Sequence, residues 1–136
     1  MRSSRLIALA LAGLPAAAVA QAPAPPRPEV VERIVAVVDE RPLLLSDLRA
    51  LMAVRGLAEG EALEAAIDER LMQLEASRLP QADVSPDEED RALSLLLETR
   101  KHLRAEAPEP DLRRLLRRQL AILKYVEFRF RPQVRI

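Results

Sequence analysis

The stretch between residues 30 and 52 constrains the fold most, because strand, turn and helix signals follow one another there. Residues 34–38 are all apolar and mostly β-branched, which predicts a strand buried on both faces. Residues 43–45 predict a short return strand, and Pro42 places it at an edge because proline donates no ladder hydrogen bond. Glu40 falls in the turn, where a positive φ would strain any residue other than glycine.

A helix is predicted directly after this hairpin, over residues 47–55. Ser46 is expected to cap its start, and Asp47 adds a negative charge to the first turn, where it complements the helix dipole. Apolar residues then recur at intervals of three and four, which is helical spacing. Gly56 is expected to end the helix.

This order of strand, turn, strand and capped helix resembles the beginning of the SurA-type periplasmic chaperones. In that family a Val-rich strand leads through an Asn-Gly-like turn into an apolar strand, and Ser-Asp-Leu or Ser-Asp-Val opens a helix. The residues that fit this pattern are Val37, Val38, Leu43, Leu45, Ser46, Asp47 and Leu48. Asp39, Glu40 and Pro42 depart from it, and Glu40 stands where the family often has Gly. A second, basic stretch that ends at residues 125–132 is also similar to the family.

The resemblance implies a mainly α fold, a four-helix SurA N-terminal-like domain over residues 30–136 with a small N-terminal β-hairpin. It also implies a chaperone-like module that binds unfolded outer-membrane or other envelope proteins. The parvulin-type isomerase domains of that family have no counterpart in the sequence. Two alternatives stay open: an envelope adaptor or scaffold that pairs with a separate protein such as a prolyl isomerase, and a truncated isomerase-chaperone.

Residues 1–20 have the features of a cleavable signal peptide. Two arginines precede an apolar run, and a small-residue motif ends at Ala20, before Gln21. Residues 21–29 are rich in proline and are expected to form an extended linker. We therefore expect export to the periplasm, with no stable membrane insertion after the signal is removed. The sequence has no cysteine, so the domain must be stable without disulfides.

Three further helices are predicted after residue 56, with prolines between them. They cover residues 60–78, residues 86–105 and a segment that begins after Pro108. Ser85 and Glu88 form a capping box at the start of the second of these. The expected inward faces are Leu63, Ile67, Leu71 and Leu74; then Ala92, Leu95, Leu96, Thr99 and Leu103; then Leu112, Leu115, Leu116, Ile122, Leu123 and Val126, with Met72 and Leu97 outside them.

The end of the chain alternates apolar and polar residues from Phe128 onward, which predicts a C-terminal strand that pairs with the opening hairpin. A helix extended through Arg131 is the alternative. We interpret Tyr125, Phe128 and Phe130 as an aromatic cluster that anchors this end in the core, with residues 134–136 covering the first strand. A cluster that contacts clients is the alternative.

Charge is distributed unevenly along the chain. Residues 59–98 hold 12 acidic and 3 basic residues, a net charge of −9, whereas residues 100–136 hold 11 basic and 4 acidic residues, a net charge of +7. The whole chain is neutral, which gives no argument for nucleic-acid binding. An arginine patch could suggest anionic lipid, but we expect its members to pair with acidic helices of the same domain. The patch consists of Arg113, Arg114, Arg117 and Arg118.

Few side chains suggest catalysis or cofactor binding. His102 is the only histidine, and without a cysteine or a second histidine it has no partner for a metal or nucleophile site. The acidic residues 87–90 are explained by their position at a helix start. We therefore expect no enzyme activity, including prolyl isomerisation, and no catalytic residue, metal or cofactor.

Overall fold

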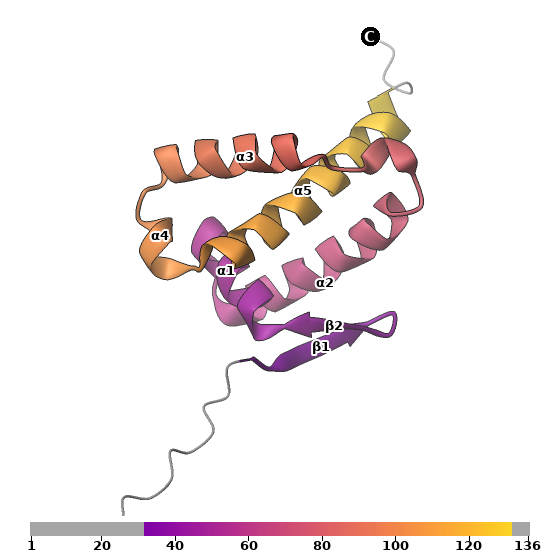
Figure 1. Cartoon of the computed structure of the whole chain (residues 1–136). Coiled ribbons are helices and arrows are strands. Elements are labelled where there is room, and N and C mark those ends of the chain that lie inside the picture. The colour runs from indigo at the N-terminus through magenta and orange to yellow at the C-terminus, as the bar shows by residue number, and fades with distance from the viewer. Residues whose placement is uncertain (1–31, 132–136) are drawn as a thin grey trace, which may run out of the picture.

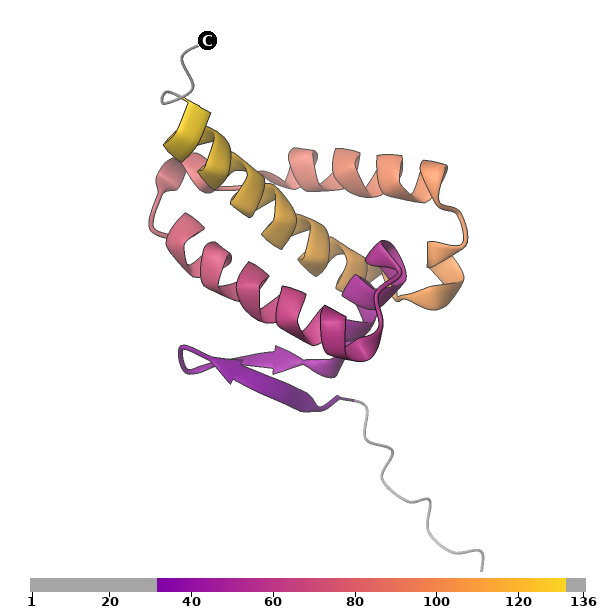
Figure 2. The ribbon, with the colours of Figure 1, turned by 180° about the vertical axis from the view of Figure 1, so that it is seen from behind.

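The computed structural model describes residues 32–131, which form a helical domain with one small antiparallel sheet (Figure 1). The elements are β1 (Ile34–Val38), β2 (Arg41–Leu44), α1 (Leu45–Arg55), α2 (Glu59–Ala76), the 3-10 helix η1 (Pro80–Ala82), α3 (Pro86–Thr99), α4 (Leu103–Glu106) and α5 (Glu109–Phe130). Helix α5 crosses the middle of the domain, with α3 on one side and α2 on the other (Figures 1 and 2). The β1–β2 hairpin packs against α2 on the side away from α5 (Figures 1 and 2).

The hairpin has the predicted order, and its turn has the strained geometry that the sequence indicated. Asp39 and Glu40 form the two-residue connection with φ angles of 49° and 61°, which are left-handed values. The register is interrupted between Ile34 and Ala36, which leaves Val35 as a bulge residue. Within residues 32–131 the sheet has two strands, so both are edge strands.

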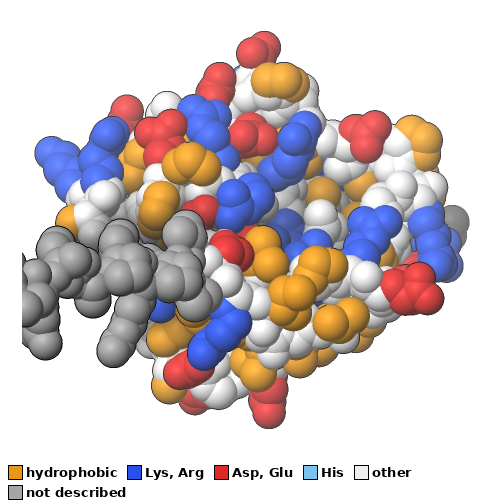
Figure 3. All heavy atoms as spheres, turned by 60° about the horizontal axis from the view of Figure 1, so that its bottom comes forward, with side chains coloured by type: hydrophobic (Ala, Val, Ile, Leu, Met, Phe, Trp, Pro, Cys, Tyr) orange, Lys and Arg blue, Asp and Glu red, His pale blue; other side chains and the backbone are white. Residues whose placement is uncertain are grey.

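The prediction that β1 is buried on both faces is wrong. Val38 is buried, but Ile34 and Val37 are exposed on the face that points away from the helices. Figure 3 looks onto this end of the molecule and shows hydrophobic side chains gathered among charged ones. Helices α1 and α2 pack against the sheet on its other face. Among the described residues no third strand pairs with it.

The start of α1 differs from the expectation that Ser46 would cap it. Leu44 is the N-cap residue, and its side chain makes no capping hydrogen bond. The backbone amide of Ser46 instead donates to Oε1 of Glu32, 14 residues earlier, at 3.1 Å. The pKa of Glu32 is lowered, mainly by a hydrogen bond with the Ser46 side chain, and the backbone amides of Arg33 and Ser46 add to this effect. A carboxylate from ahead of β1 therefore satisfies an amide at the helix start. Gly56 ends α1 in the left-handed conformation, as predicted.

Helix α2 has the predicted extent to within a few residues, but a different inward face. Ala62, Ala66 and Ala76 are buried, whereas Leu71 is exposed. Small side chains let the backbone of α2 approach its neighbours α1 and α5 closely. Of the expected stripe, Leu63 and Ile67 are partly buried and pack against the core, whereas the alanine face lies at its centre.

The predicted capping box at the start of α3 is confirmed. The Glu88 amide donates to Oγ of Ser85 at 3.3 Å, and the Ser85 amide donates to Oε2 of Glu88 at 2.8 Å. The predicted end at residue 105 is wrong, because α3 stops at Thr99. The Thr99 hydroxyl donates to the carbonyls of residues 95 and 96, which competes with helix propagation. The chain then turns, and α4 places Leu103 in the core. The described residues thus contain five α-helices rather than four.

The inward face of α3 was also assigned incorrectly. Leu97, outside the expected stripe, is 5% exposed and Leu93 is 4% exposed, whereas Leu95 is 63% exposed. Three consecutive leucines at 95–97 fit two neighbouring helix faces equally well. The packing of α3 against α5 selects the face of Leu93 and Leu97.

Helix α5 continues through Phe130, so residues 128–130 are helical and do not form a strand. Phe128 and Phe130 are exposed, which contradicts their proposed burial. The C-terminal end of α5 and the hairpin lie at opposite ends of the molecule (Figures 1 and 2). The expected contact of residues 134–136 with β1 falls outside the described residues. The core itself gathers around Leu43, Leu48, Leu51, Leu103, Leu112 and Leu115, which are all fully buried.

Candidate functional site

A surface groove of about 960 Å³ lies on the domain, and four parts of the chain form it. The end of α1 and the middle of α2 provide one side, the second half of α5 provides the floor, and the α3–α4 connection closes one end. Its lining residues are Ala53, Val54, Arg55, Gly56, Glu69, Met72, Arg100, His102, Gln119, Ile122, Leu123 and Val126.

The groove presents apolar side chains to solvent, although the domain core lies directly behind it. Leu123 is 55% exposed and Met72 is 39% exposed. Exposed apolar side chains that gather in one hollow are more informative than a single exposed leucine. Methionine is flexible and adapts its shape to different partners. The groove therefore has the surface that weak, adaptable binding of apolar chain segments requires.

Phe130 extends the same face of α5 beyond the groove. Residues four and seven apart share a helix face, so Phe130 follows Val126 and Leu123 about one turn further along. It is 49% exposed. Phe128 lies on a different face, where it lines a smaller hollow with Gln81, Lys124, Glu127 and Arg131. Tyr125 is partly buried. The three aromatic residues therefore do not form one buried cluster.

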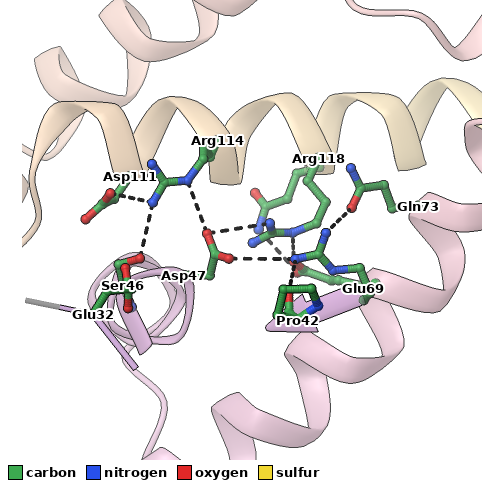
Figure 4. Close-up of polar contacts among 11 residues, drawn as sticks. Glu32, Pro42, Ser46, Asp47, Glu69, Gln73, Asp111, Arg114 and Arg118 are labelled. Carbon is green, nitrogen blue, oxygen red and sulfur yellow. Dashed lines mark hydrogen bonds and ion pairs between the residues drawn. The ribbon is translucent and has the colours of Figure 1, made fainter. Parts of the chain in front are cut away.

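A buried network of charges connects α1, α2 and α5 and reaches the groove at Glu69 (Figure 4). Asp47 is 4% exposed and faces three arginines. Its carboxylate oxygens lie 3.4 Å from Nε of Arg114, 3.7 Å from Nη2 of Arg70 and 4.0 Å from Nη1 of Arg118. Asp47 is in the first turn of α1, as predicted, but its role is tertiary because it joins three helices.

Glu69 is the second carboxylate of this network and connects it to the groove. Its oxygens lie 3.6 Å from Nε of Arg118 and 3.4 Å from Nη1 of Arg55, and Gln119 donates to it at 3.3 Å. Burial lowers the pKa of Arg70, and the neighbouring charge of Arg118 adds to this effect while Asp47 opposes it. Nη2 of Arg70 also donates to the carbonyl of Pro42 at 3.4 Å, which attaches the hairpin to α2.

The arginine patch of α5 pairs with acidic groups of its own domain, as predicted. Arg113 contacts Glu89, Asp90 and Glu109, and its hydrogen bonds to Asp90 and Glu109 raise its pKa. The other three members pair as follows: Arg114 with Asp47 and Asp111, Arg117 with Glu89, and Arg118 with Asp47 and Glu69. These pairs remove the reason to assign the patch to anionic lipid.

A further ion pair connects α5 to the start of α3. Nζ of Lys124 lies 2.6 Å from Oε1 of Glu88 and also donates to the carbonyl of Asp83 at 2.7 Å. The hydrogen bond from Lys124 is the main cause that lowers the pKa of Glu88 to about 2. Glu88 thus serves both the capping box and the contact between helices.

The remaining sequence candidates are His102 and the acidic residues at the start of α3. His102 is exposed at the edge of the groove. Residues 87–89 lie in the first turn of α3, as expected from the helix dipole. Among residues 32–131, no group of three His, Asp or Glu side chains is placed to hold a metal ion. The expected cleavage site at Ala20 and Gln21 lies outside the described residues.

Sequence reasoning missed the groove, because its members come from four separate segments and no local pattern links them. Leu123 was assigned to the inward stripe of its helix, and Met72 was the one apolar signal outside a stripe that falls in the groove. Glu69, Arg70 and Gln119 carried no signal either. An acidic residue at a position that the helical period places near the core is the feature that could have indicated Glu69.

Comparisons with known proteins do not identify the chain. No helix in the part of the chain that the structure describes combines the length and the apolar character that crossing a membrane requires. No protein-family model matches the sequence, and neither a curated protein nor a solved structure gives a match. The resemblance to SurA-type chaperones therefore stays a hypothesis that rests on the residues named above.

Proposed function

We propose that this chain is a periplasmic chaperone-like module that binds apolar segments of unfolded outer-membrane or other envelope proteins in the groove. The observation that carries the proposal is the exposed apolar floor of this groove, in particular Leu123 and Met72. Its volume of about 960 Å³ is enough for several side chains of an extended segment. The signal-peptide features of residues 1–20 and the resemblance to SurA-type proteins support the location and the class of client.

The arrangement favours binding over catalysis. A holdase needs many weak apolar contacts, whereas an isomerase or hydrolase needs polar groups converging on the reacting atoms. The polar residues of the groove are mainly engaged in contacts within the domain, such as that of Glu69 with Arg55 and Gln119. Phe130 provides a further apolar contact beyond the groove for a client that follows α5.

The test is suppression of aggregation of an unfolded outer-membrane protein, followed by light scattering. Leu123→Ser should weaken suppression several-fold because it removes an exposed side chain from the groove floor. Leu95→Ser is the matched control, since Leu95 is similarly exposed on α3 and does not line the groove. Both variants should unfold at nearly the same urea concentration as the wild type, because exposed leucines contribute little to stability.

Three results would count against the proposal: no suppression by the wild-type protein, equal loss in both variants, or no loss in either. A stoichiometric complex with a separate prolyl isomerase, together with no suppression, would favour the adaptor function instead. Phe130→Ala tests the extension beyond the groove. It should reduce suppression and leave the unfolding midpoint nearly unchanged.

A further inference from the structure

The charges that line the groove are not balanced on its accessible surface. Arg55 and Arg100 both line it, and Glu69 is the one acidic residue among its described lining residues. The Arg55 side chain is 48% exposed, whereas that of Glu69 is 11% exposed. An occupant of the groove would therefore meet guanidinium groups and little carboxylate.

The negative charge of Glu69 is already compensated within the domain. Arg118, which is buried, lies 3.6 Å from it, and Arg55 lies 3.4 Å from it. Arg118 also faces Asp47, which Arg70 and Arg114 share. Glu69 therefore presents little uncompensated negative charge to an occupant of the groove.

Arg100 adds a cation at the end of the groove. Its Nη1 donates to the carbonyl of Val54, which attaches the α3–α4 connection to the end of α1. Within residues 32–131 no carboxylate forms an ion pair with Arg100, nor with its neighbours Lys101 and Arg104 in the chain. Glu98 and Glu106 belong to the same region but do not line the groove. This contrasts with the arginines of α5, which are paired.

From this charge pattern we propose that the groove prefers apolar polypeptide segments that carry acidic residues at their ends. The inference rests on the proposed function, since it specifies which apolar segments the groove takes. An acidic flank would lie against Arg100 and Arg55, while the apolar part covers Leu123 and Met72. A basic flank would be repelled by the same groups.

The test compares three fluorescent peptides that share one apolar core and carry two Asp, two Ser or two Lys residues at the ends. Binding to the purified protein is followed by fluorescence anisotropy at low and high salt. The Asp peptide should bind about three- to five-fold more tightly than the Ser peptide, and the Lys peptide more weakly by a similar factor. These differences should disappear at about 1 M salt, where charges are screened.

Two variants locate the effect. Arg100→Gln should reduce the preference for the Asp peptide, measured as the ratio of the affinities for the Asp and Ser peptides in the same variant. Arg78→Gln is the control, because Arg78 is exposed in the turn after α2, pairs only with Glu75 in the described residues and does not line the groove. Retention of the full preference in Arg100→Gln would overturn the assignment to this end of the groove.

The outcomes separate this inference from the function on which it rests. Equal binding of all three peptides would overturn the charge preference and leave apolar binding intact. No binding of any peptide would overturn the proposed function itself. Competition by vesicles of anionic phospholipid, with no discrimination among the peptides, would assign the cations to a lipid surface and overturn the inference.

Discussion

Replacing Asp47 by Asn should destabilise the domain more than any other single change of charge to amide. Asp47 is 4% exposed, and its two oxygens lie between 3.4 and 4.0 Å from three arginines on α2 and α5. Asparagine has nearly the same shape but no charge, so the substitution tests the electrostatic contribution with little change in packing.

The size of the effect depends on which other ion pairs each of the three arginines retains in the variant. Arg114 retains Asp111 at 2.6 Å, and Arg118 retains Glu69 at 3.6 Å. Arg70 forms no other ion pair within residues 32–131 and would keep only hydrogen bonds to uncharged groups. Removing one partner of a buried pair costs about 3–5 kcal/mol, and the partial compensation here favours the lower end, about 3 kcal/mol. That is a large share of a small domain's stability.

Urea unfolding followed by circular dichroism measures this loss. With a denaturant slope of about 1.5 kcal/mol/M, the midpoint of Asp47→Asn should fall by about 2 M. Asp90→Asn is the matched control, because the Asp90 side chain is 61% exposed and its partner Arg113 keeps Glu89 and Glu109. It should cost at most about 1 kcal/mol. Equal midpoints for the two variants would refute the argument that burial makes the network important.

Three further predictions concern the turn, α3 and pH. Glu40→Gly should raise the free energy of unfolding by about 0.5–1 kcal/mol, because glycine adopts the left-handed conformation of residue 40 without strain. The greater freedom of glycine in the unfolded chain offsets part of this gain. Glu40→Ala is the control and should not raise the urea midpoint. Leu97→Ala should cost about 2–5 kcal/mol and Leu95→Ala within about 0.5 kcal/mol; similar midpoints would contradict the observed face of α3. Because the pKa of Glu88 is lowered to about 2 in the folded state, its contribution is present above the ordinary value of 4.5 and lost as pH falls toward 2. Glu88→Gln should therefore be less stable than wild type at pH 7, with the difference shrinking as pH falls through 2, and a gap that is unchanged between pH 7 and pH 2 would show that the charge is not responsible.

The sequence by itself determined the features that depend on neighbouring residues. The hairpin turn, the glycine end of α1 and the capping box of α3 were predicted correctly, because each rests on residues at most four positions apart. The pairing of the α5 arginines with the domain's own acidic groups also followed, since the charge of the two halves is opposite.

The tertiary structure decided which helix faces turn inward and where the groove lies. Periodicity allowed two faces for Leu95 and Leu97, and packing against α5 selected one. Serine is a common N-cap residue, which is why Ser46 was expected to cap α1. A carboxylate 14 residues earlier accepts the hydrogen bond at the helix start instead, because the hairpin brings Glu32 there. The groove and the network of Asp47 and Glu69 draw on segments far apart in the chain. Local patterns carry no information about such contacts, because loop lengths and close packing, rather than sequence neighbours, determine which side chains meet.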